Sequence, residues 1–438
     1  MQSASSIIRK RINVLAAVSL VFSSMVSAQN INSPYSRYGL GDILSTQNIL
    51  NRGMGGISTA YYDYQSINFL NPASYGQLQT VTLDFGVELN NLALRSLDPV
   101  RKFSNASPNI SYFNLGIPLK INKKPGLGLV FGLRPMTRIG YKIQRGERFT
   151  TPNSNDSIST LFEGNGGSQQ VFAGLGYKIK NFSIGINTGF LFGSKDYSTR
   201  RLFINDTVLY YKSNHETKSN YNGLFFNAGA QYTATLGKKM LLRFGVQGNW
   251  QQTLNGTEDL IRETFEYDAN SGTFTIDSVY AEKDKKGDVI MPASFSGGII
   301  LDKTGKWLIG VDYTTTKWSN YRYFGIKEPV QDSWQLHLGG QLFPSPGKSY
   351  WSNVAYRTGF TYGRDYITIG KELPRWAFSI GAGLPMRRVA YTNQFTIINT
   401  SFEVGQRGNN SNSLKESFFR ISVGLSMSDL WFIKRKYD

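Results

Sequence analysis

The feature that most constrains the fold is a strict alternation of apolar with polar or small residues. In residues 81–89, which read VTLDFGVEL, every odd-numbered residue is apolar and every even-numbered residue is polar or small. Side chains of a strand point alternately to opposite faces, so such a strand has one apolar and one hydrated face. The same period returns along most of the chain, and a strand needs about 9 to 11 tilted residues to cross a bilayer. The pattern predicts a transmembrane β-barrel.

Composition supports this prediction and excludes a helical membrane protein. The mean hydropathy is -0.29, and after the N-terminus no apolar run approaches the ~20 residues of a spanning helix. The chain contains 45 Gly, 28 Phe and 25 Tyr, a mixture that suits strands with aromatic girdles at the membrane surfaces. A soluble β-sandwich shares this composition, but repeated long amphipathic strands are excessive for that fold.

The N-terminus is typical of a secretory signal peptide. The basic residues RKR at 9–11 precede an apolar run over 14–22, and VSA at 26–28 offers small residues for cleavage. Residues 1–28 are therefore predicted to be removed, and the outer membrane is the expected destination. The chain has no cysteine, so it contains neither a lipid-anchoring thiol nor a disulfide.

The chain carries a large positive charge whose partner must be sought outside the cell. The formal charge is +18, and it falls to +15 when the three basic residues of the signal peptide are subtracted. Nucleic acid is excluded as a partner, because secretion separates the protein from nucleic acid and because the basic residues are scattered along the chain. Outer-membrane lipid, anionic lipopolysaccharide and acidic substrates fit the charge better.

Turn residues divide residues 79–428 into strands. Six short turns lie near residues 122–126, 180–181, 237–239, 302–306, 344–352 and 385–388. Seven longer polar connections lie near residues 95–108, 145–167, 200–218, 267–287, 320–331, 364–373 and 406–415. These predict an all-β, antiparallel barrel of about 14 strands, with short periplasmic turns, long outer loops and a periplasmic C-terminal tail over 429–438.

The segment 29–78 lacks sustained alternation and is too long for a simple extension. It is either a flexible periplasmic arm or a plug inside the lumen. A barrel of this size has a lumen wide enough to need filling, which favours the plug.

Three motifs in this segment resemble a known family. Residues 33–42 read SPYSRYGLGD, residues 52–56 read RGMGG, and residues 68–73 read NFLNPA. Together they resemble the N-terminal hatch of the FadL-type outer-membrane transporters, in the version found in Bacteroidota, and further matches follow in the expected order, beginning with PASF at 292–295. The hatch motif residues are Gly55, Gly56, Asn71, Pro72 and Ala73.

The resemblance implies uptake of hydrophobic or amphipathic small molecules, chiefly long-chain fatty acids. The hatch would gate a pocket, and the cargo would leave sideways through the barrel wall. A closed ladder has no gap, so some strand must lose hydrogen bonds, and proline or a bulge is the usual means. Pro135 lies in the third strand, where the resemblance places the lateral opening. The alternative is that Pro135 merely ends a strand at the outer rim.

Basic residues predicted to face the lumen are candidates for binding a carboxylate headgroup. A guanidinium group pairs bidentately with a carboxylate. The candidates are Arg134, Arg138 and Lys142 in the third strand, with Arg243 and Arg357 elsewhere; Arg375 and Arg420 share the lumenal parity. The alternative is that these groups pair with lumenal acids such as Asp84, Glu88 and Asp312.

Catalysis is not expected, and neither a cofactor nor a metal site is predicted. The chain has only two histidines, His215 and His337, and no cysteine, and no nucleophile–base spacing appears. The rival to transport is a FadL-like barrel that transports nothing and is a subunit of an outer-membrane protein secretion or barrel-assembly complex. An open apolar pocket behind the hatch favours transport, whereas a lumen packed shut by side chains, with large apolar outer loops, favours assembly.

Overall fold

The computed structural model describes residues 33–97, 100–121, 124–151, 154–204, 210–237, 239–268, 272–344, 347, 349–386 and 394–429. The predicted signal peptide lies outside these residues, as does the predicted C-terminal tail apart from Asp429.

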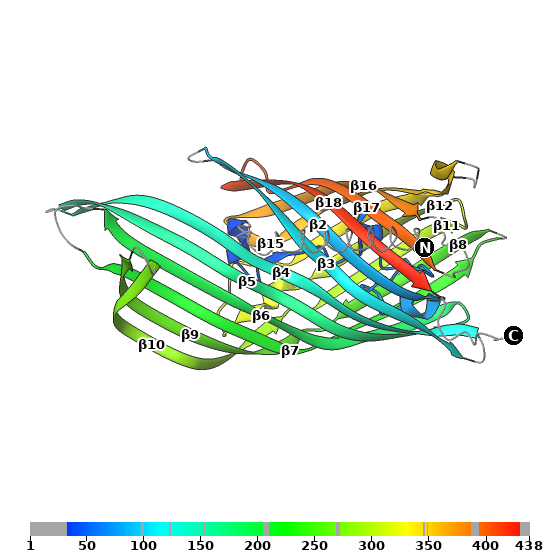
Figure 1. The fold of residues 1–438 in the computed structure, drawn as a ribbon, viewed down its shortest axis with the longest axis horizontal. Coiled ribbons are helices and arrows are strands. Elements are labelled where there is room, and N and C mark those ends of the chain that lie inside the picture. Colours follow the sequence, from blue (N-terminus) through cyan, green and yellow to red (C-terminus); the bar gives the residue numbers. More distant parts are fainter. Residues whose placement is uncertain are drawn as a thin grey trace, which may run out of the picture.

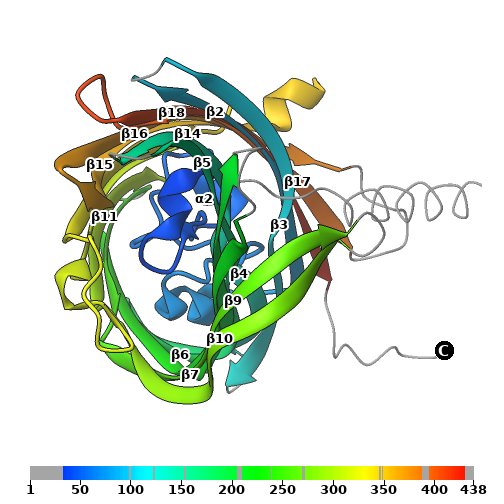
Figure 2. The ribbon, with the colours of Figure 1, turned by 90° about the vertical axis from the view of Figure 1, so that its left-hand side faces the viewer.

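Fourteen strands form a closed antiparallel barrel, which confirms the predicted architecture (Figures 1 and 2). Each strand pairs with its neighbours, and β18 pairs with β2 to complete the ring. The barrel strands are β2 (Val81–Ser96), β3 (Lys102–Ile121), β4 (Lys124–Thr151), β5 (Ser154–Ile179), β6 (Phe182–Ile204), β7 (Lys212–Thr235), β8 (Met240–Asn249), β11 (Ser294–Lys303), β12 (Trp307–Thr316), β14 (Ser333–Leu342), β15 (Ala355–Ile369), β16 (Lys371–Pro385), β17 (Phe395–Arg407) and β18 (Leu414–Asp429).

The alternation seen in the sequence is the inside–outside pattern of this barrel. In β5 and β6, apolar residues such as Val171, Leu175, Ile184 and Ile186 are 44–47% exposed, as expected of side chains that face lipid. In β2, Asp84 and Glu88 lie on the opposite face and are buried in the lumen. The hairpin turns at Lys180–Asn181, as predicted.

Most of the connections predicted as long outer loops are strands instead. The hairpins β4–β5 and β6–β7 continue as paired strands through the predicted loops 145–167 and 200–218. A further hairpin, β9 (Gln252–Asp268) and β10 (Gly272–Met291), occupies the predicted loop 267–287 and pairs with the outer part of β7. Beyond the membrane both faces of a strand are hydrated, so the backbone ladder continues while the apolar alternation stops.

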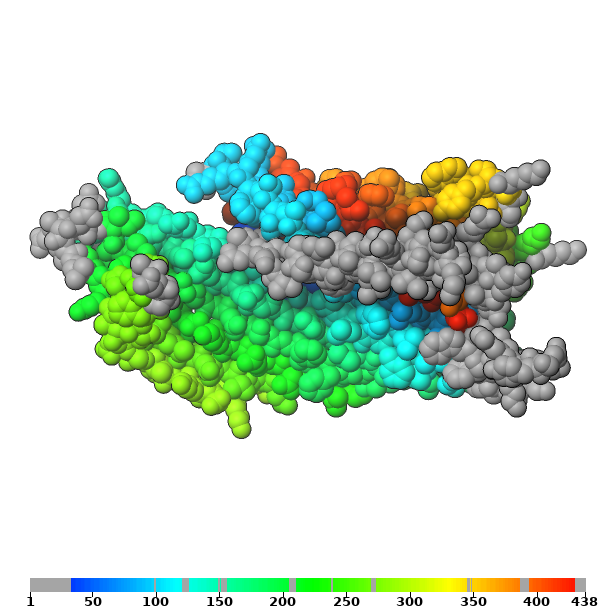
Figure 3. Space-filling view, viewed as in Figure 1, coloured from blue at the N-terminus to red at the C-terminus, as the bar shows by residue number. Residues whose placement is uncertain are grey.

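These long strands form a tall wall on one side of the barrel. Figures 1 and 3 show β4 to β7, β9 and β10 projecting well beyond the opposite rim, which is formed by β15 to β18. The connection between β12 and β14 is the one outer connection that folds irregularly over many described residues, with η3 (Trp318–Asn320) and β13 (Arg322–Tyr323). At the short-turn end, η4 (Tyr350–Asn353) lies between β14 and β15.

Residues 33–78, hereafter the hatch segment, lie inside the barrel (Figure 2). The segment contains η1 (Pro34–Arg37), β1 (Asp42–Ile43), α2 (Ile49–Arg52) and η2 (Pro72–Gln77). Many of its apolar residues are almost fully buried, among them Leu40, Ile49, Met54, Ile57, Ile67 and Tyr75. Among the described residues, none of the helices has the length and apolar character needed to cross a membrane.

Candidate functional site

The NPA sequence of the hatch motif forms a tight turn against the wall near the short-turn end. Asn71 begins η2, and its side chain accepts a hydrogen bond from the backbone N–H of Ala73 over 3.1 Å. Its amide nitrogen donates to the carbonyl of Thr59 over 2.7 Å. The wall approaches so closely that a Cβ added to Gly185 would lie 2.3 Å from the carbonyl carbon of Pro72. Glycine in the wall therefore makes room for this turn.

The second part of the motif docks on the opposite wall. Gly55 and Gly56 have φ angles of 65° and 87°, which favour glycine. A Cβ on Gly55 would lie 2.5 Å from the carbonyl oxygen of Leu338. The carbonyl of Gly55 accepts hydrogen bonds from Thr361 (2.7 Å) and from Nδ1 of His337 (2.8 Å). These two glycines fix the hatch segment against β14 and β15.

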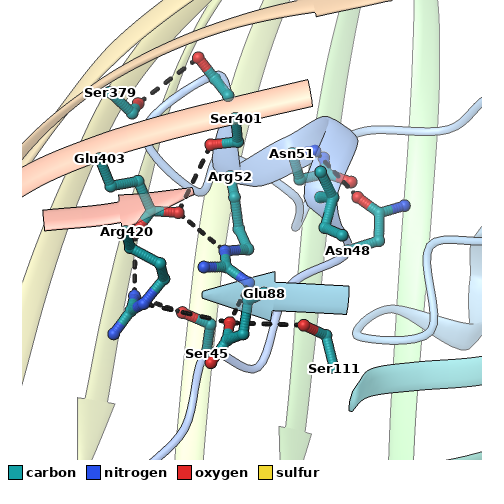
Figure 4. Close-up of polar contacts among 12 residues, drawn as sticks. Ser45, Asn48, Asn51, Arg52, Glu88, Ser111, Ser379, Ser401, Glu403 and Arg420 are labelled. Atoms are coloured by element: carbon teal, nitrogen blue, oxygen red, sulfur yellow. Dashed lines mark hydrogen bonds and ion pairs between the residues drawn. The ribbon is translucent and has the colours of Figure 1, made fainter. Parts of the chain in front are cut away.

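A buried ion-pair network joins the hatch segment to β2, β17 and β18 (Figure 4). Arg52 of α2 donates to Glu403 and to Glu88, each over 2.7 Å. Arg420 donates to the other oxygen of Glu403 over 2.9 Å. All four side chains are at most 10% exposed. Burial by itself lowers the pKa of Arg52, but the carboxylates of Glu403 and Glu88 raise it by more, so the net pKa lies above the ordinary value.

A second buried cluster holds β1. The Arg407 guanidinium pairs with Asp42 of the hatch segment over 2.7 Å, with Asp365 over 2.8 Å and with Glu416 over 3.4 Å. The hydroxyl of Ser33 donates to Glu416. The hatch segment is therefore tied to the outer half of the wall by two separate sets of charges.

The wall is interrupted next to Pro135. The β3–β4 ladder ends at the pair Phe113–Leu133, two residues before Pro135, and the described residues 102–112 of β3 pair only with β2. The β4–β5 ladder shifts register between Pro135 and Thr137, which marks a β-bulge. The proline thus lies inside a strand and not at its end, beside a break in the β3–β4 ladder.

The hatch segment occupies part of the edge that β3 leaves open. Residues of β1 pair antiparallel with Thr137 and Arg138, and the N–H of Leu44 donates to the carbonyl of Met136 over 3.0 Å. Farther out, the N–H of Gly140 donates to the hydroxyl of Ser36. Backbone groups of β4 that lose β3 as a partner therefore bond to the hatch segment.

The predicted basic ladder on β4 does not form, because the bulge shifts the alternation. Beyond it, Ile139 and Tyr141 are buried, whereas Lys142 is half exposed and pairs with Glu163 over 2.8 Å. Arg134 does face the lumen, where it donates to Gln170 over 2.7 Å and stacks over Phe69. Lys142 is therefore not a lumenal ligand-binding group.

The other arginines predicted to bind a carboxylate differ in their partners. Arg243 lies near the short-turn end and pairs with Asp302. Arg357 bonds to the amides of Gln341 and Asn399 over 2.5 and 2.9 Å. Arg138 is partly buried, and neither an ion pair nor a hydrogen bond from its side chain is found among the described residues. Asp84 and Asp312 accept hydrogen bonds from backbone N–H groups of the hatch segment and do not pair with arginine.

The cavity described in the outer half of the lumen is small and strongly charged. A cavity of about 160 Å³ lies between hatch residues 42–47 and the wall. Its charged lining consists of Arg52, Arg138, Arg375, Arg407, Arg420, Asp42, Asp365, Glu403 and Glu416. Pockets for drug-sized ligands usually measure ≈ 300–1,000 Å³ and are mostly apolar. A larger cavity of about 540 Å³ opens at the short-turn end, between residues 61–64 and the turns of β11–β12 and β14–β15.

An aromatic cap closes the outer end of the hatch segment. Trp318 of η3 stacks on Tyr366 with ring centroids 4.3 Å apart. Glu328 accepts from the N–H of Gly39 and from Lys195, each over 2.5 Å. Tyr321 and Tyr323 of the β12–β14 connection are buried in this cap.

Comparisons with known proteins place the chain in a family. A family model described as BamG matches residues 7–438. The chain belongs to the BamG family. No curated protein matches the chain. Among the described residues, no group of acidic or histidine side chains is arranged to hold a metal ion.

Solved structures show the fold of this BamG-family protein. A FadL homologue of Pseudomonas aeruginosa is 14% identical, with a TM-score of 0.57, over 88% of this chain and 99% of that one. The toluene transporter TodX of Pseudomonas putida is 13% identical, with the same TM-score and coverage. The monoaromatic hydrocarbon channel CymD is 15% identical, with a TM-score of 0.52, over 88% of this chain and 98% of that one. The shared fold points to an outer-membrane protein.

The residues that anchor the hatch segment of this BamG-family barrel were not singled out as anchors from the sequence. Arg52 appeared only inside the RGMGG motif, and Asp42 only at the end of the SPYSRYGLGD motif. A signal was present, because an arginine buried in a predicted plug needs hydrogen-bond acceptors, and a carboxylate is the strongest of these. The two carboxylates that pair with Arg52 lie 36 and 351 residues away in the sequence. The alternation of residues along the strands does not predict which carboxylates these are.

Proposed function

We propose that this protein is a filled FadL-like barrel that transports nothing and is a scaffold subunit of an outer-membrane protein secretion or barrel-assembly complex. The observation that carries the proposal is the filled outer half of the lumen; the cavity of about 540 Å³ lies at the short-turn end. The hatch segment is fixed by two buried charge clusters, and the outer cavity measures only about 160 Å³. Because its lining carries nine charged side chains, an acyl chain would gain little there.

The outer wall supports the same proposal. Strands β4 to β7, β9 and β10 extend past the opposite rim, beyond the height at which we expect lipid to cover their side chains. Apolar residues are exposed there: Ile204, Tyr211, Phe274, Ile276, Val279 and Tyr280. Exposed apolar residues that lipid does not cover mark protein contact surfaces. A wall of this kind suits a scaffold that contacts other subunits at the cell surface.

A disulfide lock tests the proposal directly. The hydroxyls of Thr59 in the hatch segment and Ser296 in β11 lie 2.7 Å apart, so Thr59→Cys with Ser296→Cys would place two sulfurs near bonding distance. The chain has no cysteine of its own. The matched control is Thr137→Cys with Ser168→Cys, which joins β4 to β5 within the wall over the same hydroxyl distance.

The expected result is that oxidised locked protein restores secretion or barrel insertion to a deletion strain as well as wild type does. Reporter proteins in the outer membrane and the medium would be measured with and without reductant. Loss of assembly in the oxidised lock, with the wall control unaffected, would mean that the hatch segment must move. A deletion that lowers fatty-acid uptake and leaves assembly intact would overturn the scaffold proposal.

Lateral uptake of amphiphiles is the second candidate, and the broken β3–β4 ladder favours it. The break adjoins Arg138, which lines the outer cavity without a partner among the described residues. In this alternative, Pro135→Val or Arg138→Ala lowers uptake of a labelled fatty acid several-fold at unchanged expression. The oxidised Thr59–Ser296 lock would stop uptake too, whereas the wall control would not.

A further inference from the structure

The net positive charge is concentrated at the short-turn end of the barrel. Each of the six connections at this end carries at least one lysine or arginine in the sequence. None of these connections carries an acidic residue, and the neighbouring Asp302 in β11 is already paired with Arg243. By contrast, residues 258–288 of the outer β9–β10 hairpin contain nine acidic and four basic residues. The excess charge is therefore at the end assigned to the periplasm.

The described lysines of these connections, together with Lys303 at the end of β11, are free to bind an external anion. Lys180, Lys239 and Lys306 are exposed, and Lys303 is half-buried. None of the four has an ion pair among the described residues. Lys180, Lys239 and Lys306 lie in three separate connections, those of β5–β6, β7–β8 and β11–β12, and Lys303 ends β11. The surface is thus an arc along the barrel edge and not a patch on one loop.

The position of these lysines points to the membrane surface. Lys180 lies between Ile179 and Phe182, which are 48% and 43% exposed and face outward. Leu236, at 57% exposed, precedes Lys239. The connections are too short to carry a lysine far from the bilayer, because β6 starts three residues after β5 ends. A basic group beside the last lipid-facing residue lies at headgroup level.

We infer that this arc of lysines binds the anionic headgroups of phospholipids in the periplasmic leaflet of the outer membrane. An acidic patch on a periplasmic protein is the competing occupant. The arrangement around the edge, with lipid-facing residues next to the lysines, favours lipid. The inference does not depend on whether the barrel transports or serves as a scaffold.

The test uses the mature full-length protein in nanodiscs with equal amounts of phosphatidylglycerol and phosphatidylethanolamine. Native mass spectrometry of the released protein counts the retained lipids. The test variant combines Lys180→Gln, Lys239→Gln, Lys303→Gln and Lys306→Gln. The matched control combines Lys102→Gln, Lys283→Gln, Lys286→Gln and Lys371→Gln, four exposed lysines of the outer end without ion pairs. Heat-modified gel mobility checks that each variant is folded.

Each lysine near an anionic membrane surface changes the binding constant by about fivefold. We expect wild type to retain phosphatidylglycerol over phosphatidylethanolamine, the periplasmic variant to lose at least about tenfold of this preference, and the outer variant to keep it. Raising the salt concentration should weaken the preference. The inference is overturned if wild type shows no preference, if both variants lose it equally, or if the periplasmic variant keeps its lipids while an acidic protein that co-purifies with wild type is lost.

Discussion

The hatch segment meets two sides of the wall in different ways. On the side of β2, β17 and β18 the ladder is complete, and contact is made by charged side chains around Arg52 and Arg407. On the side of β3 and β4 the ladder is broken, and contact is made by the backbone of β1. An unpaired backbone group in the hydrocarbon region costs several kcal/mol, so a barrel opening needs a substitute partner. The hatch segment therefore stabilises the wall at the broken β3–β4 ladder, whereas the intact wall of β2, β17 and β18 anchors the hatch segment.

The largest expected effect comes from breaking the charged side. Replacing Arg52→Leu leaves Glu88 and Glu403 buried without the partner that lies 2.7 Å away, which should lower the free energy of unfolding by about 3–5 kcal/mol. Urea unfolding in liposomes, followed by tryptophan fluorescence, measures the change. Lys142→Ala is the control, because its half-exposed pair with Glu163 should contribute less than about 1 kcal/mol. Equal losses in the two variants would contradict the anchoring role.

A smaller effect is expected at the Gly55 contact. Gly55→Ala places a methyl group 2.5 Å from the carbonyl oxygen of Leu338 at a φ of 65°. Steric conflict and backbone strain should together lower stability by about 2–3 kcal/mol. Gly297→Ala is the matched control, since a Cβ there meets no atom within 4 Å. If the two variants unfold at the same urea concentration, the contact between Gly55 and β14–β15 is looser than described.

The two sides also differ in how far the sequence predicted them. The strand pattern of the barrel was predictable because lipid selects an apolar residue at every second position, as in Val171, Leu175, Ile184 and Ile186. The outer wall was predicted as loops because that selection ends where both faces of a strand are hydrated. Because proline has no N–H, Pro135 indicated either a broken ladder or the end of a strand, and the sequence left both alternatives open. The bulge after it shifted the alternation by one residue, which reversed the expectation for Lys142.

On the open side, Arg134 tests how much a neutral partner contributes. Arg134→Ala removes the hydrogen bond to Gln170 and the contact with Phe69, and leaves the buried Gln170 oxygen without a donor. The expected loss is about 1–2 kcal/mol of unfolding free energy. The double variant Arg134→Ala with Gln170→Ala should lose less unfolding free energy than the two single variants lose in sum, because the two side chains interact. Strict additivity would show that the bond contributes little.

The smallest expected effect separates stability from ligand binding at the break itself. Arg138 has no side-chain partner among the described residues, and it lines a cavity that holds four further arginines. Arg138→Ala should therefore change the free energy of unfolding by no more than about 0.5 kcal/mol in either direction. If the break admits an amphiphile, the same change lowers labelled fatty-acid uptake, because a carboxylate entering there loses an unpaired guanidinium. If uptake and stability both stay at the wild-type level, Arg138 serves neither role, and the opening is a feature of a filled scaffold. A loss above about 1 kcal/mol would instead mean that Arg138 has a structural partner, and that the open side is held by charge as the other side is.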